Sequence, residues 1–505
     1  MAPLPSSAVV GVVGAGTMGS GIAQVAAAAG HAVLLFDSQS GATERGIAAI
    51  RAALARVVER KRMTEDEAEA LLARIRPAAS LDALKPAALV VEAIVEDMAT
   101  KKALFTALEA LLAEDAILAT NTSSLSITEM AGSLKHPERV VGLHFFNPAP
   151  IMPLVEVISG FATAPAVADT AFETALAWGK TPVRVKSTPG FLGNRVARPY
   201  YGEALRSLEE DVADVPTYDA IMREAAGFRM GPFELLDLVG IDVNWAVTNS
   251  VHDAYFHDPR YKPFRIQGEM VAAGRLGRKT KLGFYDHREG APRPIPSTAE
   301  PGPRPDHVII EGDLGPARAL EGRIERAGLA FRRVPGAGLI ALKDVRIALS
   351  DGRLATERLA TDVAAPQVLF DLALDYGTAT RIAIAAADQA PPSATEAAAG
   401  LFQALGLSVS VVDDVPGLVA LRTVAMLANF GADAVHVGIA DAPGVDRAMQ
   451  VGFNYPKGPL AWAQSLGLPF VVSVLDHLAR TYGEDRYRAS PLLRRHAASG
   501  ARFFD

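Results

Sequence analysis

A glycine-rich turn near the N-terminus limits the fold of this chain more than any other feature. Residues 8–13 form a short β-branched run, the turn Gly14-Ala15-Gly16-Thr17-Met18-Gly19 follows, and an Ala-rich segment then continues to residue 29. A second apolar run over residues 32–36 ends in Asp37. Glycines at this spacing allow a tight turn, a close approach to the backbone and close packing of a helix on a strand. The pattern predicts a doubly wound parallel α/β domain.

The same turn predicts a dinucleotide site in this Rossmann-type domain. The helix N-terminus would hold a pyrophosphate, and Asp37 would accept hydrogen bonds from the adenosine ribose. The charge of Asp37 repels a 2′-phosphate, and Ser38 and Gln39 follow it in place of an arginine, which favours NAD over NADP. The predicted cofactor contacts in this element are Gly14, Gly16, Thr17, Met18, Gly19 and Asp37.

Composition excludes several other classes of protein. The 505 residues include no cysteine, so thiol nucleophiles, disulfides and thiolate metal sites are excluded, and we expect no metal. A net charge of −7 indicates no nucleic-acid partner. The apolar run at residues 22–29 is too short to span a membrane, and residues 1–7 lack the pattern of a signal peptide. We therefore expect a cytoplasmic protein.

A histidine and a carboxylate on two neighbouring strand patterns form the candidate catalytic pair. His144 follows the strand pattern at residues 139–143, and Glu156 lies within the pattern at residues 154–158. Imidazole ionises near neutrality, and a carboxylate that reaches the ring fixes its tautomer and stabilises the imidazolium. For His144 considered alone, the alternative is a buried histidine with a structural role.

Further polar residues follow two buried strand patterns. Glu96 and Lys101 come after residues 89–93, and Asn121, Ser123 and Ser124 come after residues 116–119. The carboxyl ends of parallel strands are where doubly wound folds bind ligands, so we expect these side chains near the cofactor. The alternative is that Asn121 or one of the two serines caps a helix beginning near Ser126.

The remaining segments of the first half read as helical. Residues 41–76 predict two helices with a break near Thr64, and the basic end of the first, including Arg60 and Lys61, is either a solvated face or a site for substrate phosphates. Residues 187–210 predict one long helix on which Asn194 and Arg198 share a face. Helices continue to residue 273, and the Pro-rich residues 291–305 are the best linker candidate.

The second half of the chain is a diverged copy of the first. An offset of 227 residues aligns Pro189-Gly190 with Pro416-Gly417 and Gly231-Pro232 with Gly458-Pro459, and an offset of 298 aligns Gly14 with Gly312. The shorter second copy is expected to lack the helical pair at residues 41–76. Its polar residues are not retained, because Asp37, His144, Glu156 and Asn194 align with Pro335, Asp371, Ala383 and Leu421. We expect this copy to fold without binding NAD or reacting.

The chain is therefore divided into five segments. Residues 1–186 are the NAD-binding Rossmann domain, 187–286 a helical domain, 287–305 the linker, 306–411 a degenerate Rossmann-like domain, and 412–505 a second helical domain.

Residues 8–286 resemble the 3-hydroxyacyl-CoA dehydrogenase family. The resemblance rests on the glycine turn, residues 91–96, residues 121–124, the run Gly142-Leu143-His144-Phe145-Phe146-Asn147-Pro148, and residues 188–191 with Asn194-Arg195. The two-copy architecture, with the motifs at residues 454–462 and 482–487, resembles bacterial members that oxidise 3-hydroxyadipyl-CoA in phenylacetate degradation.

The resemblance implies a role for each matching residue. His144 matches the general base and Glu156 its partner, whereas Ser123 and Asn194 match residues that hold the reacting oxygen and the thioester. Glu96, Lys101 and Asn147 match residues around the nicotinamide and its ribose, and Lys279 matches a further cofactor contact. The family places a serine and a lysine against CoA where this chain has Ala53 and Arg60 or Lys61, so the CoA contacts depart from the pattern.

The resemblance implies NAD-dependent oxidation of a (3S)-3-hydroxyacyl-CoA. A 3-hydroxyadipyl chain ends in a carboxylate, for which Arg198 is the candidate partner; the alternative for Arg198 is a surface ion pair. The alternative substrate is 3-hydroxybutyryl-CoA. Alternatives of other kinds are a non-catalytic NAD-binding structural or sensor protein and a reductase of small β-hydroxyacids, which usually relies on a lysine base. We expect the two helical domains to form an intrachain pseudo-dimer, and whole chains to be capable of further homo-oligomerisation.

Overall fold

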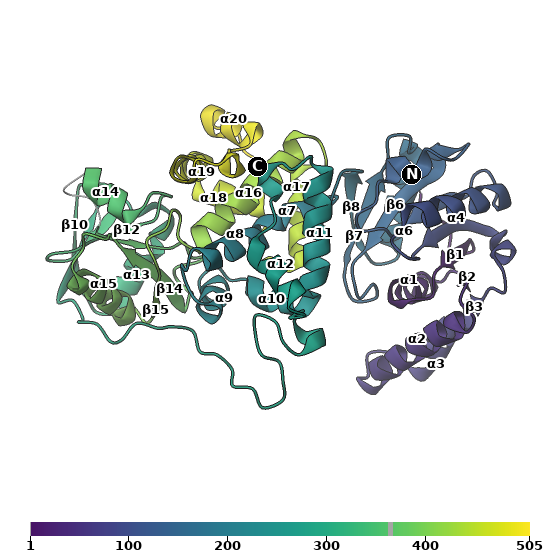
Figure 1. Ribbon diagram of the computed structural model, residues 1–505, viewed down its shortest axis with the longest axis horizontal. Helices are drawn as coiled ribbons and strands as arrows, with labels where there is room; N and C mark the ends of the chain where they lie inside the picture. Colours follow the sequence, from purple (N-terminus) through teal and green to yellow (C-terminus); the bar gives the residue numbers. More distant parts are fainter. Residues whose placement is uncertain (1, 362–366) are drawn as a thin grey trace. The chain divides into compact units, whose positions relative to one another are not determined.

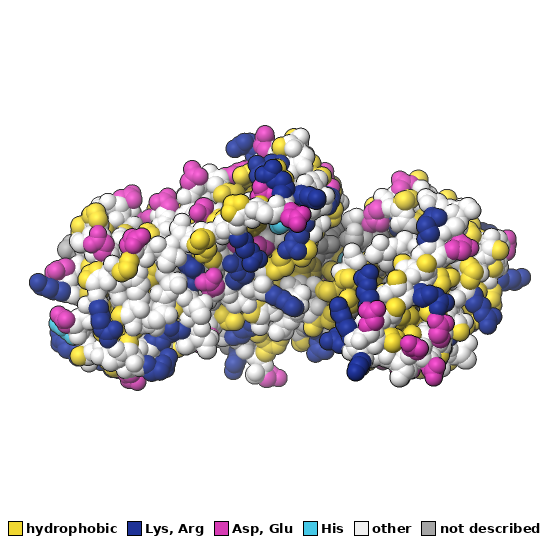
Figure 2. All heavy atoms as spheres, turned by 90° about the horizontal axis from the view of Figure 1, so that it is seen from below, with side chains coloured by type: hydrophobic (Ala, Val, Ile, Leu, Met, Phe, Trp, Pro, Cys, Tyr) yellow, Lys and Arg dark blue, Asp and Glu magenta, His cyan; other side chains and the backbone are white. Residues whose placement is uncertain are grey.

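The structure, a computed structural model, describes residues 2–361 and 367–505, which form two compact units. The N-terminal unit contains the chain up to Gly193 together with Gly438–Phe453, a segment from the second copy. The C-terminal unit contains Asn194–Val437 and Asn454–Asp505. Basic and acidic side chains are interspersed on the face that Figure 2 shows. Every helix of the described residues is too short or too polar to cross a bilayer.

The N-terminal unit is built on an eight-stranded sheet with the order β3-β2-β1-β4-β5-β6-β7-β8 (Figure 1). The strands are β1 Val9–Val13, β2 Val33–Phe36, β3 Ile75–Pro77, β4 Ala87–Glu92, β5 Ile117–Thr120, β6 Val140–Phe145, β7 Leu154–Ser159 and β8 Thr181–Lys186. Neighbouring strands are parallel except β6 and β7, which are antiparallel. The central strands are buried along their length because both faces of the sheet are covered. The predicted doubly wound fold is confirmed.

Helices connect these strands and close the core of the N-terminal unit. They are α1 Thr17–Ala28, α2 Ala42–Glu59, α3 Glu65–Ala73, α4 Met98–Leu111, α5 Ile127–Ala131, α6 Pro165–Ala177 and, from the second copy, α17 Ala442–Phe453, with short 3-10 turns at Leu81–Leu84 and Pro137–Arg139. The helical pair α2 and α3 breaks where predicted, and Thr64 and Glu67 form a capping box at the start of α3. The prediction that this pair extends to Arg76 is wrong, because α3 ends at Ala73 and Arg76 lies in β3.

The first helical copy opens the C-terminal unit. Its helices are α7 Gly193–Val196, which starts at the last residue of the N-terminal unit, α8 Arg198–Glu209, α9 Val215–Glu224, α10 Pro232–Val239, α11 Ile241–Ala254 and α12 Arg265–Ala272, with 3-10 turns at Pro259–Tyr261 and Arg278–Thr280. The prediction of one long helix to residue 210 is wrong, because the helix is interrupted at Ala197. Pro199 follows this break; proline has no N–H to donate within a helix, and its ring clashes with the preceding turn.

The second copy supports this explanation. Its aligned helix, α16 Ala420–His436, has Met426 at the position of Pro199 and is continuous. Its other helices are α13 Ala319–Arg326, α14 Ala355–Thr361, α15 Pro392–Ala404, α18 Pro459–Leu466, α19 Leu468–Tyr482 and α20 Pro491–Ser499, with 3-10 turns at Gly315–Ala317 and Asp485–Tyr487. One proline therefore accounts for a local difference between two otherwise aligned helices.

A smaller second sheet lies in the C-terminal unit. Its order is β10-β9-β11-β12-β13-β14-β15, with β9 His307–Glu311, β10 Ala330–Val334, β11 Leu339–Ala341, β12 Arg346–Leu349, β13 Val368–Phe370, β14 Arg381–Ala386 and β15 Ser408–Val411. The strand β9 repeats the bounds of β1 at the offset of 298, and β14 repeats those of β7 at the offset of 227. Only residues 335–338 separate β10 from β11, so the predicted loss of the helical pair is confirmed.

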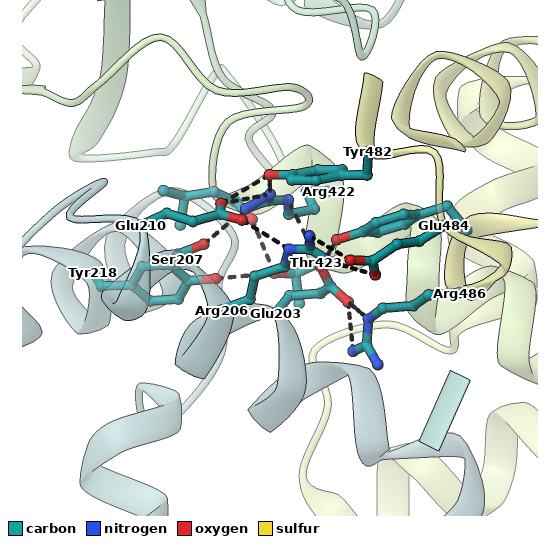
Figure 3. Close-up of polar contacts among 12 residues, drawn as sticks. Glu203, Arg206, Ser207, Glu210, Tyr218, Arg422, Thr423, Tyr482, Glu484 and Arg486 are labelled. Atoms are coloured by element: carbon teal, nitrogen blue, oxygen red, sulfur yellow. Dashed lines mark hydrogen bonds and ion pairs between the residues drawn. The ribbon is translucent and has the colours of Figure 1, made fainter. Parts of the chain in front are cut away.

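A buried polar cluster joins the two helical copies within the C-terminal unit (Figure 3). Arg422 of α16 is fully buried, donates a hydrogen bond to Ser207 of α8 at 3.0 Å and also hydrogen-bonds Tyr482. Arg486 donates to Glu203 of α8 from Nε at 3.0 Å and from Nη2 at 2.7 Å. These bonds connect α8 of the first copy to residues of the second copy, so the two helical copies pack on each other.

Candidate active site

The glycine turn has the geometry that a dinucleotide requires. Gly14 has a φ of +101°, and a Cβ at this position would collide with the carbonyl oxygen of Ala93. A Cβ on Gly19 would collide with the carbonyl oxygen of Gly14, so α1 packs tightly on the turn. A Cβ on Gly16 would meet nothing within 4 Å, which leaves open space at the N-terminus of α1. The first and third glycines are required by packing, and the second faces a ligand-sized space.

Asp37 borders the same space at the end of β2. Its carboxylate accepts hydrogen bonds from the backbone N–H groups of Ala15 at 2.7 Å and Gln39 at 2.8 Å. A cavity of about 450 Å³ opens here, a volume in the range of small-molecule and cofactor sites. Asp37, Gly16 and Thr17 line this cavity, whereas Met18 packs against the core. These residues fit a bound dinucleotide.

The basic end of α2 lies apart from this cavity. Arg60 caps the C-terminus of α2, Lys61 follows it, and neither residue lines the cavity. Arg45, Ala49 and Ala53 of α2 line it instead. Sequence reasoning missed Arg45, and its position in the first turns of a helix that follows the dinucleotide strand was the available signal.

A buried ion-pair network lies at the ends of β4 and β5. Lys101 is 1% exposed, and its Nζ lies 2.5 Å from Glu92 and 3.3 Å from Glu96. Thr120 of β5 donates to Glu92 at 2.7 Å. Sequence reasoning assigned no role to Glu92, although a carboxylate that ends an apolar strand is unusual and requires a buried partner. Glu92 anchors the ammonium of Lys101 beside Glu96.

The loop after β5 is organised around Glu96. Its carboxylate accepts hydrogen bonds from the hydroxyl of Thr122 at 2.5 Å, the N–H of Ser123 at 3.0 Å and the hydroxyl of Ser124 at 3.2 Å. Burial opposes ionisation of Glu96, but the hydrogen bonds and the charge of Lys101 outweigh it and lower the pKa of this carboxyl. Glu96 is therefore an anion that holds the Ser123 loop in place.

The capping alternative for this loop is wrong. The side chain of Ser126, not of Asn121, Ser123 or Ser124, accepts the N–H of Glu129 and caps α5. Asn121 instead accepts the N–H of Phe145 through Oδ1 at 2.9 Å, which ties the end of β5 to the end of β6. Ser123 is half-buried, and its hydroxyl is not used as a cap.

His144 and Glu156 face each other across two antiparallel strands. They are direct partners in the register of β6 and β7, so both side chains lie on the same face of the sheet. Nδ1 of His144 lies 2.7 Å from Oε2 of Glu156, and both residues are buried. Because the carboxylate occupies Nδ1, the neutral ring carries its proton there and leaves Nε2 as the acceptor. This geometry suits a general base.

The other oxygen of Glu156 holds the start of α7. Oε1 accepts the N–H of Gly193 at 2.8 Å and that of Leu192 at 3.2 Å. The ring of Phe146 lies 4.5 Å from that of His144, and the ring of Phe191 lies 6.0 Å away. The histidine–carboxylate pair is thus held by backbone donors on one side and by apolar rings on the other.

The remaining predicted residues lie in several places. Asn147 is exposed and precedes Pro148 after β6. Asn194 directly follows Gly193 in α7, and its carbonyl accepts Nε of Arg198 at 2.7 Å. Arg198 is buried rather than exposed, so the alternative of a surface ion pair is wrong. Lys279 pairs with Asp242 of α11 at 2.5 Å, within the C-terminal unit.

The second copy shows what happens to the same framework without the histidine. Asp371, which aligns with His144, is fully buried and accepts the N–H groups of Val419, Ala420 and Leu421 at the start of α16. Burial raises the pKa of Asp371 to about 6, against the stabilising effect of these N–H groups. A carboxylate still holds the helix start, as Glu156 does in the first copy, but it belongs to the residue that aligns with His144.

A doubly wound sheet with a dinucleotide turn and a buried histidine–carboxylate pair defines an NAD-dependent dehydrogenase. The sequence matches the family described as "3-hydroxyacyl-CoA dehydrogenase, NAD binding domain" over residues 9–188. It matches the C-terminal domain of that family over residues 190–287 and 417–502, and a "3-hydroxybutyryl-CoA dehydrogenase reduced Rossmann-fold domain" over residues 347–416. The chain belongs to the 3-hydroxyacyl-CoA dehydrogenase family.

Individual relatives agree on the family. The chain is 44% identical to a 3-hydroxyadipyl-CoA dehydrogenase of Escherichia coli over 97% of both chains. A crystal structure described as 3-hydroxybutyryl-CoA dehydrogenase from Escherichia coli has 43% identity and a TM-score of 0.90, covering 98% of this chain and 99% of that one. A 3-hydroxybutyryl-CoA dehydrogenase of Clostridioides difficile is 43% identical over 55% of this chain and 99% of its own length. The names of these relatives differ in the acyl chain.

Proposed function

We propose that this enzyme oxidises (3S)-3-hydroxyadipyl-CoA to the 3-oxoacyl-CoA, with His144 as the general base. The observation that carries the proposal is the buried hydrogen bond between His144 and Glu156, on two strands of the dinucleotide-binding domain. The first copy retains this pair, whereas the second copy has lost it. This contrast argues against a non-catalytic NAD-binding protein, and a histidine base argues against a reductase that relies on lysine.

Each side chain has a defined part in the reaction. When bound, NAD⁺ supplies the acceptor for the hydride that leaves C3 of the substrate. Nε2 of His144 removes the proton of the C3 hydroxyl, and Glu156 stabilises the imidazolium that results. Ser123 and Asn194 donate hydrogen bonds to the oxygens of the substrate. The apolar rings beside His144 limit the access of water to the imidazole.

The cofactor is held by residues of the N-terminal unit. Gly14, Gly16 and Gly19 shape the pyrophosphate site, and Asp37 accepts hydrogen bonds from the adenosine ribose. We place Glu96, Lys101 and Asn147 near the nicotinamide and its ribose, and Asn121 between the ends of β5 and β6. Lys279, which pairs with Asp242, is a further candidate for the cofactor.

Arg198 supports a substrate with a terminal carboxylate. Burial lowers the pKa of its guanidinium, which donates to the hydroxyl of Thr248 at 2.9 Å and to the carbonyl of Asn194. Across residues 2–361 and 367–505, no carboxylate forms an ion pair with Arg198. Burying a cation without an anionic partner costs free energy, which the carboxylate of a ligand would offset. The cavity that it lines is only about 20 Å³, so we place the substrate carboxylate at its mouth.

The names of two relatives point to two different substrates. The Escherichia coli relative that aligns with 97% of this chain is named a 3-hydroxyadipyl-CoA dehydrogenase, whereas the solved structure is described as a 3-hydroxybutyryl-CoA dehydrogenase. The resemblance to enzymes of phenylacetate degradation favours the longer diacid. We therefore propose 3-hydroxyadipyl-CoA as the substrate and keep 3-hydroxybutyryl-CoA as the second candidate.

A substrate panel tests the proposal. NADH formation is followed at saturating NAD⁺ with 3-hydroxyacyl-CoA esters of four to eight carbons, with and without a terminal carboxylate. We expect kcat/KM to be highest for the six-carbon diacid, and R198L to lower this preference over 3-hydroxybutyryl-CoA while R198K retains part of it. An unchanged preference in a folded R198L variant would remove Arg198 from the proposal, and no turnover of any ester would remove the activity.

Two groups of cationic residues at the ends of α2 are candidates for contact with the CoA part of the substrate. Arg45 lines the cavity beside the glycine turn, whereas Arg60 and Lys61 lie at the far end of α2. We propose that Arg60 and Lys61 meet the CoA phosphates, because a long thioester extends well beyond its reacting atoms. Substituting both residues by alanine should raise KM for the CoA ester and leave KM for NAD⁺ unchanged.

The two helical copies form the arrangement that we interpret as an intrachain pseudo-dimer. At the offset of 227 residues, Arg195 and Tyr255 align with Arg422 and Tyr482, and each arginine hydrogen-bonds its own tyrosine. Arg195 also pairs with Asp433 of the second copy at 2.6 Å. A stable, soluble monomer of residues 1–290 alone would contradict this interpretation. Further association of whole chains can be measured by sedimentation.

A further inference from the structure

The segment Gly438–Phe453 of the second copy belongs to the compact unit that contains His144. Its helix α17 packs on β7 and β8, and the carbonyl of Ile439 accepts the N–H of Lys186 at the end of β8. Gly452 lies directly against Leu154 of β7, where a Cβ would collide with the leucine side chain. A helix of the second copy, which has no histidine at the position of His144, therefore packs at the edge of the sheet that carries His144.

Phe453, the last residue of α17, contacts both supports of the His144–Glu156 pair. Its ring lies 5.7 Å from that of Phe146 in an edge-on arrangement, and Phe146 lies 4.5 Å from His144. A Cβ on Gly193 would lie 2.5 Å from Cε2 of Phe453 and 3.5 Å from Oε1 of Glu156. The phenyl ring thus limits the movement of Phe146 on one side and of the Gly193 backbone on the other.

The pseudo-symmetric position shows that an aromatic ring is not needed for the packing itself. At the offset of 227 residues, Phe453 aligns with Ala226, which follows α9. The helix α9 packs on β14 of the second sheet, and Glu224 at its end pairs with Arg381 of that strand at 2.9 Å. The residue at the reciprocal position is therefore a buried alanine where the sheet carries Asp371, and a phenylalanine where it carries His144.

We propose that Phe453 is a positioning residue for the dehydrogenase reaction, supplied by the second copy to the active site of the first. It acts through Phe146, which it holds against the imidazole of His144, and through Gly193, whose N–H fixes Glu156. This inference rests on the proposed function of His144 as the general base. Phe453 itself touches no reacting atom. It also assigns a role to the second copy, which completes the active site rather than duplicating it.

The test uses the full-length chain with single substitutions in α17. We expect F453A to lower kcat about 10-fold or more, with KM for NAD⁺ within twofold of the wild type and little change in Tm, since Phe453 is only half-buried. F453L, which retains most of the apolar volume, should recover much of the loss. Q450A alters an exposed residue of the same helix and serves as the matched control.

A double substitution separates positioning from general destabilisation. G193A places a methyl group against Phe453 and should lower kcat, and F453A in the G193A background should raise kcat again by removing the collision. The inference is overturned if F453A matches the wild type in kcat, or if F453A and G193A lower kcat independently. Failure of the proposed function would appear differently, as a wild-type enzyme that oxidises no 3-hydroxyacyl-CoA.

Discussion

Glu156 holds His144 and the start of α7 at the same time. Oε2 lies 2.7 Å from Nδ1 of His144, and Oε1 accepts the N–H of Gly193 at 2.8 Å. Each oxygen therefore has a fixed partner, and the carboxylate cannot rotate without losing one of them. The orientation of the imidazole is thus coupled to the backbone position of Gly193, the last residue of the N-terminal unit before Asn194.

This arrangement predicts that E156Q loses activity through the wrong tautomer. The amide oxygen must face the N–H groups of Leu192 and Gly193, so the amide NH₂ faces Nδ1 of His144. The ring then carries its proton on Nε2, which can no longer act as the base. We expect kcat to fall about 10²–10⁴-fold with unchanged affinity for NADH, measured by fluorescence titration. E129Q, at an exposed ion pair, is the control and should remain active.

Removing the base itself has a similar effect. H144Q should bind NADH normally and turn over about 10²–10⁴-fold more slowly, because the general-base contribution to the transition state is lost. Steady-state NADH formation with the preferred CoA ester measures this change. H136Q changes an exposed histidine that pairs with Glu138 and should retain wild-type kinetics. Near-normal turnover of H144Q would refute the assignment of the base.

The glycine turn predicts two different defects for two similar substitutions. G19A introduces a methyl group into the carbonyl of Gly14 and should destabilise the N-terminal unit, which a lower Tm would reveal. G16A meets no protein atom within 4 Å, so we expect a normal Tm but a large loss of NADH affinity. Equal effects on Tm for the two variants would contradict the view that only Gly16 faces the pyrophosphate.

Asp37 should determine the preference for NAD⁺ over NADP⁺. D37N retains the size of the side chain but removes its negative charge. The carboxylate accepts hydrogen bonds from the ribose hydroxyls, and its charge repels a 2′-phosphate. Hydrogen bonds to charged groups contribute about 1.5–3 kcal/mol, so we expect KM for NAD⁺ to rise about 10-fold or more. The ratio of kcat/KM for NAD⁺ to that for NADP⁺ should fall. If D37N changed only kcat, the carboxylate would not be a ribose contact.

Asp371 predicts a pH dependence of stability in the second copy. Because the pKa of Asp371 is raised to about 6 in the folded state, its contribution to stability is complete below pH 4 and is lost as pH rises through 6. D371N lacks this titration, so the deficit in its free energy of unfolding relative to the wild type should shrink by about 2 kcal/mol between pH 4.5 and 7.5. Urea unfolding across this range measures the difference. A deficit that grows with pH would contradict the prediction.

Much of the fold could be predicted from local patterns. The turn from Gly14 to Gly19, with Asp37 after the next apolar run, predicted the order of strand and helix because each glycine has a local steric reason. The repeat at offsets of 227 and 298 predicted the second copy and its missing helical pair, since glycine and proline positions record backbone geometry. The break at Ala197 was missed because one helix was predicted over residues 187–210, across Pro199, although the proline itself was the signal.

The partners of the buried charges could not be predicted in the same way. Glu92 and Lys101 are nine residues apart, but their contact depends on how β4 and α4 pack. Arg198 was expected either at a substrate or on the surface, and only packing shows that it is buried. A sequence records which residues are polar, whereas the cost of burying them and the identity of the compensating group depend on the surrounding atoms.

The sequence by itself determined the class of this protein. The strand–glycine–helix pattern reflects short-range sterics, and the polar residues stand at recognisable positions after the predicted strands. Only the tertiary structure decided that Glu156 faces His144 in register, that its second oxygen is fixed by Gly193, and that Phe453 lies against both supports. These contacts join residues from distant parts of the chain. Side-chain packing in three dimensions, rather than any local preference, brings them together.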